Sequence, residues 1–297
     1  MPENFSYSST TLRRFNHMSK RLSSLIVTAA VIAVTALVLA AGASGASSLP
    51  TLTVALTGTK GVSVSGSIRS GAVNVTSTFS GKAPSGPNSN GPTFGLVRLN
   101  PGASIQQAAG AVQSHHGDLN ALTPYGTLLV DASAPGAVQT VLTAGNYVAL
   151  NITGNGSPAF APFTVTQSSS PAALPNAAAT ETAIEFGFRG PTVLHSGTIL
   201  RAQNGGYLVH MIVGIGVKNA ATGRQVMALL RAGKDGKAQK LASRQFLNLA
   251  GPLSPGGMQQ AILTAKPGYY VEACFMDTQD GREHTQLGML RLIRVVK

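Results

Sequence analysis

Short apolar runs, separated by Gly, Pro, Ser and Asn, follow one another along most of this chain. Val73-Asn74-Val75-Thr76 alternates between apolar and polar side chains, and Ala183–Phe188 alternates in part. A period of two is expected when one face of a strand is buried. The predicted strands form two groups, Thr51–Leu56, Val73–Phe79, Phe94–Leu99, Thr127–Val130, Val138–Leu142 and Tyr147–Ile152, and then Ala183–Phe188, Ile199–Ala202, His210–Ile215, Gln260–Leu263, Tyr269–Phe275 and Leu290–Val296.

Two helices are predicted among the strands, each from a capping signal. Ser104 stands three residues before Gln107, and Thr222 stands three residues before Gln225. In a Ser/Thr-x-x-Gln capping box, the hydroxyl and the amide satisfy backbone N–H groups that a new helix leaves free. The predicted helices lie near Ile105–Gln113 and Gly223–Arg231.

Two parts of the chain resemble each other, which predicts an internal repeat. Gln139–Asn151 matches Gln260–Cys274 with one two-residue gap. A Ser/Pro/Ala-rich stretch without apolar periodicity lies between the parts, and such stretches are typical of linkers. The predicted order is a leader (1–46), a first β-domain (47–166), a linker (167–180) and a second β-domain (181–297).

The leader has the features of an export signal. Four basic residues between positions 13 and 21 precede a charge-free apolar run, Leu25–Ala41, and small-residue cleavage sites end at Ala43 and Ala46. This order is typical of a secretory signal peptide. The alternative is an uncleaved membrane anchor, because the run of 17 residues is near the lower limit for spanning a bilayer. With Met1 or Met18 as the start, the mature chain is predicted to be extracytoplasmic, secreted or associated with the cell envelope, without a transmembrane segment.

The chain is basic although only 11% of its residues are charged, against 43% apolar. The net charge is +12, and without the leader 18 basic minus 9 acidic residues leave +9. The expected partners are an anionic envelope polymer or an acidic redox partner. Nucleic acid is not expected, because no aromatic residues interleave the basic ones. The basic cluster, which an ordinary solvated surface also explains, is Lys218, Arg224, Arg231, Lys234, Lys237, Lys240 and Arg244.

Cys274 is the only cysteine of the chain. A disulfide needs two thiols, so in an exported protein this thiol pairs between chains, stays buried and inert, or binds a metal. His284 and Met289 follow it, and a thiolate, an imidazole and a thioether together suit copper, which takes two His and one Cys in a plane with a weak axial Met. The alternative for each of these side chains is an ordinary place in the core.

The approach to Cys274 and the spacing after it carry a family resemblance. Pro267-Gly268-Tyr269-Tyr270 leads into Cys274, and four residues separate His284 from Met289. The segment resembles the C-terminal ligand loop of the cupredoxins, the family of plastocyanin and azurin. The resemblance implies a mainly β fold of two tandem cupredoxin-like Greek-key β-sandwiches, each with one short helix. It also implies that His210, in the strand before the helix, completes a set of four copper ligands in the second domain.

Two features depart from that family. Nine residues separate Cys274 from His284, where cupredoxins have only a few, and Met211 follows His210 where many relatives carry Asn. Asp280-Gly281 is a natural turn that can return the longer loop to the site. If the ligands converge, the two ring nitrogens and the sulfur should lie within roughly 4 Å of one another.

The implied function is electron transfer or copper handling by one copper ion, without bond-making chemistry. The alternative is a metal-free extracytoplasmic β-sandwich that binds or supports other components of the cell envelope. In the first copy, Thr93 and Asn151 stand where the second has His210 and Cys274, so the first domain is predicted to bind no transition metal. An enzyme is not predicted, because the sequence has neither a His-x-His pair nor a Gly-rich phosphate loop.

Overall fold

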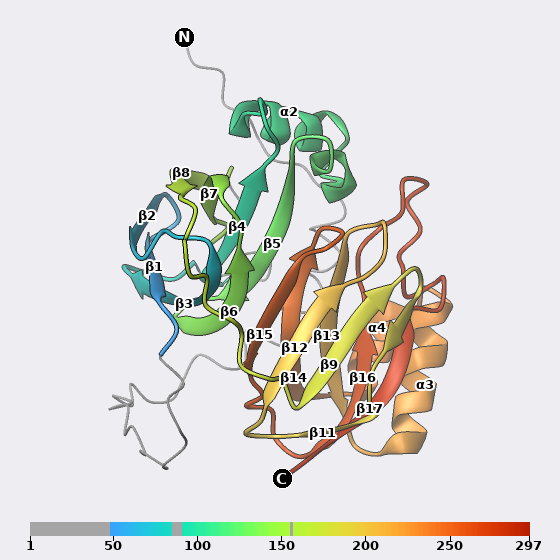
Figure 1. Cartoon of the computed structure of the whole chain (residues 1–297). Coiled ribbons are helices and arrows are strands. Elements are labelled where there is room, and N and C mark those ends of the chain that lie inside the picture. Colours follow the sequence, from blue (N-terminus) through green and yellow to red (C-terminus); the bar gives the residue numbers. More distant parts are fainter. Residues whose placement is uncertain (1–47, 85–90, 155–156) are drawn as a thin grey trace.

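The computed structural model describes residues 48–84, 91–154 and 157–297, which form two β-sandwiches joined edge to edge (Figure 1). The predicted leader lies outside these residues. The prediction of a mainly β fold is confirmed, since three sheets make up the framework. No helix in the described part of the chain has the length and apolar character needed to cross a membrane.

The first sandwich packs two four-stranded layers face to face. One layer has the strand order β6-β3-β1-β2, and the other has the order β5-β4-β7-β8. Leu52, Phe94 and Val130 belong to the apolar core between the layers. Burying one such side chain contributes about 1.5–3 kcal/mol. The strands are β1 (Thr51–Thr57), β2 (Gly61–Gly66), β3 (Gly71–Ser80), β4 (Thr93–Leu99), β5 (Gly126–Ser133), β6 (Gly136–Leu142), β7 (Gly145–Asn151) and β8 (Ala159–Val165).

The second sandwich has the same arrangement with one more strand. Its layers have the orders β10-β9-β12-β15 and β11-β17-β16-β13-β14. Every residue of β13 is buried, so this strand lies at the centre of the second core. The strands are β9 (Ala179–Ile184), β10 (Gly187–Arg189), β11 (Val193–His195), β12 (Ile199–Asn204), β13 (His210–Val217), β14 (Ala242–Leu253), β15 (Met258–Ile262), β16 (Gly268–Ala273) and β17 (Leu290–Val296).

One sheet runs through both sandwiches. β6 pairs with β15 at Gln139 and Gln260, which makes eight strands continuous. The side chains of the same two residues also meet, because Gln260 Nε2 donates to Gln139 Oε1 at 2.9 Å. Further bonds cross the junction, among them those from Leu128 N to Ser254 Oγ at 3.0 Å, from Asp131 N to Gln259 Oε1 at 3.2 Å, and from Thr140 Oγ1 to Met258 O at 2.6 Å. These bonds fix the two sandwiches relative to each other.

The stretch predicted as a linker is held against the first sandwich. Ser168 N donates to Ser70 Oγ at 2.9 Å, and Ala72 N donates to Ala172 O at 2.8 Å. β9 begins at Ala179, so the last two residues of this stretch belong to a strand. The path of the chain between the sandwiches is therefore fixed by hydrogen bonds to the first sandwich.

The helices differ from the prediction in the second sandwich. In the first, α2 (Ile105–Ser114) has the predicted capping box, and a 3₁₀ helix, η1 (Leu119–Leu122), follows it. The predicted box at Thr222 is wrong, because α3 (Ala220–Arg231) starts earlier, with Asn219 as its cap. Asn is one of the strongest N-cap residues. A further helix, α4 (Asp235–Leu241), gives this sandwich two helices instead of the predicted one.

One predicted strand is corrected, and four edge strands, β2, β8, β11 and β14, were missed. The predicted strand Ala183–Phe188 is a hairpin, because the chain turns at Glu185 and Phe186 between β9 and β10. β8 and β14 were not predicted, and each contains a proline, Pro162 or Pro252. Both are edge strands, where the missing N–H leaves no partner strand unsatisfied. The sequence pattern therefore located the central strands better than the edges.

Candidate metal centre

The first two candidate ligands lie on neighbouring strands. His210 is the first residue of β13, and Cys274 follows the last residue of β16. The strands are antiparallel, and their register pairs Val213 with Ala273. The start of β13 therefore lies beside the end of β16, which brings the imidazole and the thiol to the same end of the sandwich.

The long loop after Cys274 folds back as a small hairpin. Asp277 and Glu283 form a bridge, and Thr278 N donates to Arg282 O at 2.8 Å. As a result, His284 N donates to Met276 O at 2.8 Å. The hairpin accommodates the additional residues between Cys274 and His284, which make this loop longer than in the cupredoxin pattern, and it returns His284 to the site.

A tight turn then leads from His284 to Met289. Met289 N donates to His284 O at 2.9 Å, and Cys274 N donates to Met289 O at 3.4 Å. Gly288 has φ +99, a conformation that side chains with a Cβ rarely adopt. The turn between His284 and Met289 therefore requires a glycine at position 288.

Three donor atoms converge at this point. His210 Nδ1 lies 3.2 Å from His284 Nδ1, and Cys274 Sγ lies 3.8 Å and 3.3 Å from these two nitrogens. Metal–nitrogen bonds of about 2.0 Å and metal–sulfur bonds of about 2.3 Å, about 100–120° apart, place such donors roughly 3.1–3.8 Å from one another. The three distances match this range. Among the described residues, these three form the one group of His, Cys or acidic side chains with metal-site spacing.

The cluster is closed to solvent, and this sets the protonation of its members. Exposure is 1% for His210 and 0% for both Cys274 and His284. Burial raises the pKa of the Cys274 thiol to about 12. Burial, and then the nearby His210, lower the pKa of His284 to about 4, and burial also lowers the pKa of His210. At neutral pH the metal-free cluster therefore holds a thiol and two uncharged imidazoles.

Backbone N–H groups face the sulfur. Met211 N donates to Cys274 Sγ at 3.4 Å, and the backbone N–H of Met276 also bonds to it. Such donors favour the thiolate that a metal needs.

The ring of His284 is fully buried. His284 Nε2 is buried and has no hydrogen-bond partner in the described structure. Phe186 packs edge-on against the His284 ring, at 5.3 Å between the ring centroids.

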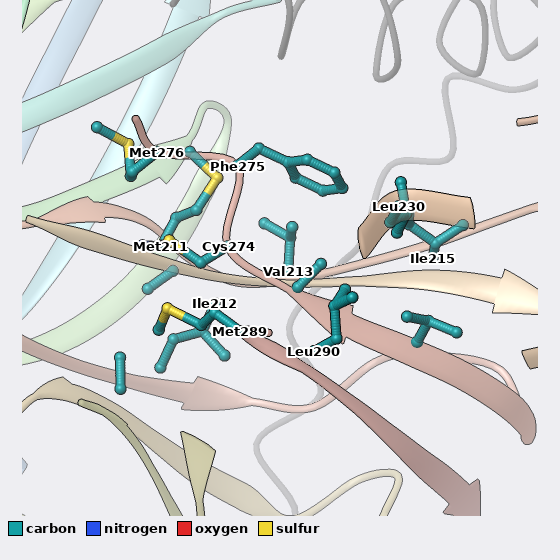
Figure 2. Packing of buried hydrophobic residues seen from close by; sticks show 14 of the residues in the cluster. Met211, Ile212, Val213, Ile215, Leu230, Cys274, Phe275, Met276, Met289 and Leu290 are labelled. Carbon is teal, nitrogen blue, oxygen red and sulfur yellow. Dashed lines mark hydrogen bonds between the residues drawn. The ribbon is translucent and has the colours of Figure 1, made fainter. Parts of the chain in front are cut away.

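Met289 lies in the same buried cluster as the three donors. Its exposure is 0%, and Figure 2 shows its side chain in the packed cluster that also contains Cys274. The side chains of Met211 and Met276 also belong to this cluster (Figure 2). The four residues implied by the resemblance are thus all at one end of the second sandwich.

Sequence reasoning missed three residues that support the site. Glu185 Oε1 lies 3.4 Å from His210 Nε2, and the next residue, Phe186, contacts His284. From the first sandwich, Asn120 Oδ1 accepts from Val209 N at 2.7 Å. Burial raises the pKa of Glu185, but backbone N–H donors outweigh this and hold the pKa below its usual value. Residues in turns and short 3₁₀ helices follow no apolar period, so no sequence pattern points to these three.

The first sandwich holds a structural amide where the second holds the thiol. Asn151 Nδ2 donates to Gly58 O at 3.1 Å and to Gly61 O at 2.8 Å, and Asn151 Oδ1 accepts from Thr153 N at 3.1 Å. Thr93 N donates to Thr153 Oγ1 at 3.3 Å. Both positions are therefore occupied by hydrogen-bonded polar groups instead of metal donors.

The remaining polar candidates lie on the surface. His115, His116 and His195 are exposed, and His195 Nδ1 pairs with the backbone O of Lys297 at 3.2 Å. All seven residues of the basic cluster are exposed. This surface lies next to the ligand turn: a Cβ on Gly288 would lie 3.9 Å from Arg231 Nη2, and one on Gly233 would lie 3.5 Å from Gln286 Nε2. The basic surface therefore borders the turn that carries His284.

No protein-family model matches this chain, and no curated protein sequence matches it. Among solved structures, auracyanin B has 16% identity over 40% of this chain and 87% of its own, with a TM-score of 0.24. Auracyanin from Roseiflexus castenholzii has 14% identity over 40% of this chain and 95% of its own, with a TM-score of 0.24. Copper nitrite reductase from Nitrosomonas europaea has 10% identity over 83% of this chain and 93% of its own, with a TM-score of 0.23.

The cupredoxin-like character of the chain rests on its own strand order and donor cluster. In the second sandwich the first His begins the central strand β13, and the Cys, the second His and the Met lie at the same end, between β16 and β17. The His210–Cys274–His284 cluster in the later part of the chain fits a single copper ion.

Proposed function

We propose that this protein binds one copper ion through His210, Cys274 and His284, with Met289 as a weak axial ligand, and serves in electron transfer or copper handling. The observation that carries the proposal is the convergence of two ring nitrogens and one sulfur within 3.8 Å of one another. Soft thiolate together with imidazole is a donor set that copper prefers.

The arrangement of the site supports electron transfer in preference to substrate chemistry. Copper, when bound, supplies a one-electron couple, and the chain supplies a fixed cage of donors. His284 is held at its backbone N–H and its carbonyl, and Cys274 receives two backbone N–H groups. The ligand cluster is closed to solvent, which favours transfer of an electron over binding of a substrate.

Export, an internal repeat and a docking surface belong to the same proposal. The basic and apolar leader supports export to an extracytoplasmic location. The matching layer orders of the two sandwiches, and the pairing of Gln139 with Gln260, support a repeat. The exposed basic cluster beside the ligand turn supports docking of an acidic redox partner, or of an anionic envelope polymer.

The test is the visible absorption spectrum of the copper-loaded mature chain. Charge transfer from the Cys274 sulfur is expected to colour the oxidised protein intensely, and Cys274→Ser is expected to abolish the colour because a hydroxyl cannot replace the soft thiolate. Met289→Leu is expected to keep the colour and shift the reduction potential. If the wild-type chain takes up no copper after dialysis, the metal-free envelope module is the function that remains.

A further inference from the structure

One tight turn touches both histidines of the cluster. β9 and β10 pair with Ile184 opposite Gly187, so only Glu185 and Phe186 form the turn. Phe186 has φ +55, in the left-handed region that the second central residue of a type II turn requires. Glu185 faces His210, and Phe186 faces the ring of His284. The turn therefore closes the outer side of the candidate copper site.

Glu185 is held in place independently of His210. Its Oε1 accepts hydrogen bonds from the backbone N–H groups of Tyr207 and Leu208, the second at 3.1 Å. A Cβ on Gly206 would collide with the same carboxylate, so only glycine allows this close approach. The carboxylate thus occupies a fixed position beside the strand that begins with His210.

The base of the hairpin is also anchored to the ligand-bearing layer. Arg291 of β17 forms ion pairs with Glu181 of β9 and, at 2.6 Å, with Glu272 of β16. Both carboxylates are fully buried. Because Glu272 lies two residues before Cys274, this triad connects the hairpin to the strand that leads to the thiol.

We propose that Glu185 is a positioning residue of the copper site, which holds the Nε2–H of His210 and so directs the lone pair of Nδ1 toward Cys274 and His284. The inference rests on the proposed copper function. His210 Nε2 lies 3.4 Å from Glu185 Oε1, whereas its Nδ1 lies 3.2 Å from His284 Nδ1. A carboxylate is a stronger hydrogen-bond acceptor than a neutral imidazole, so the proton belongs on Nε2.

The charge of Glu185 has a further consequence for the metal. A carboxylate that accepts from the outer nitrogen of a ligating imidazole raises the basicity of that imidazole and orients its ring. A negative charge near a closed site also favours the more positive oxidation state. Glu185 is therefore expected to strengthen Cu(II) binding more than Cu(I) binding and to lower the reduction potential.

The test compares Glu185→Gln with Asp235→Asn. Glutamine keeps the shape and the acceptor oxygen but removes the charge, whereas Asp235 is a carboxylate in the first turn of α4, outside the loops that carry the ligands. Glu185→Gln is expected to weaken Cu(II) binding about 10–100-fold. Each tenfold excess of the Cu(II) loss over the Cu(I) loss raises the potential by about 59 mV. Asp235→Asn is expected to leave both affinities unchanged.

A copper-independent measurement separates this inference from the proposed function. In the metal-free chain, the two-bond ¹H–¹⁵N spectrum of His210 is expected to show the Nε2–H tautomer, and Glu185→Ala is expected to mix it with the Nδ1–H tautomer. The proposal is overturned if wild-type His210 is Nδ1–H, or if Glu185→Gln keeps the wild-type ratio of Cu(II) to Cu(I) affinity. A wild-type chain that binds no copper but shows the Nε2–H tautomer overturns only the copper function.

Discussion

Copper binding by this chain is predicted to release one proton, and that proton comes from Cys274. The number of released protons can be measured by loading the chain with Cu(II) at different pH values. Burial raises the pKa of the thiol to about 12, whereas the pKa values of His210 and His284 lie below those of free imidazole. Above about pH 7 the imidazoles are already neutral, so the thiol is the only ligand that must lose a proton.

The size of the effect follows from the thiol. Ionising a group of pKa about 12 at pH 7 costs about 7 kcal/mol, at 1.36 kcal/mol for each pH unit. Each rise of one pH unit lowers this cost by about 1.36 kcal/mol, so the apparent Cu(II) affinity is expected to rise tenfold per pH unit. Between about pH 7 and pH 9 the affinity should rise about 100-fold.

Competition titrations with a chelator of known pH dependence measure this slope. Calorimetry in two buffers of different ionisation enthalpy counts the released proton directly at pH 7. Cys274→Ser provides the control, because it removes the ionising group together with the tight site. A slope near zero would show that the thiol does not bind copper, and a slope near two would show that an imidazole is protonated at neutral pH, contrary to its burial.

Three further outcomes are expected. Without metal, the stability of the wild-type chain relative to His284→Gln should fall by about 3 kcal/mol as the pH drops from about 6.5 to 4, because the unfolded chain protonates His284 first; denaturation of both chains at several pH values measures this, and a constant difference contradicts it. Asn120→Ala should cost about 1–3 kcal/mol by leaving the Val209 N–H unpaired, and should weaken copper binding as well; unchanged copper affinity would exclude support from the first sandwich. Asp131→Asn should stabilise the chain at pH 8 by up to about 4 kcal/mol but not at pH 3.5. Burial raises the pKa of the native Asp131 carboxyl to about 7, so between about pH 4 and pH 7 the native chain binds more protons at this position than the unfolded chain. An equal change in stability at both pH values would contradict this reasoning.

The apolar pattern was enough to locate the central strands. β13 is buried along its whole length, and its sequence is a continuous apolar run. The pattern failed where burial does not decide the structure. β8 and β14 lie at sheet edges and contain a proline, and the β9–β10 turn interrupts an apolar stretch that looks like one strand. Edge pairing and two-residue turns depend on the neighbouring chain, which a local pattern does not contain.

The candidate ligands could be picked out in the sequence because their types of side chain are rare in this chain. Cys274 is the only cysteine, and His210 is the only histidine inside a predicted strand of the second half. Their supporting residues could not be located, because Glu185 and Asn120 are common surface types whose role depends on long-range contacts. Asn120 comes from the other sandwich and acts on a residue 89 positions away.

The two sandwiches show how similar frameworks come to carry different chemistry. In the second, the end of β16 presents a thiol that faces two imidazoles. In the first, the end of β7 presents Asn151, whose amide donates to the carbonyls of Gly58 and Gly61 and accepts from Thr153 N. A thiol at position 151 could not satisfy both carbonyls, which would each lose a hydrogen bond worth about 1 kcal/mol. The apolar core therefore specifies the sandwich in both halves, while one polar side chain at the end of a central strand decides whether that end binds a metal or fastens a turn.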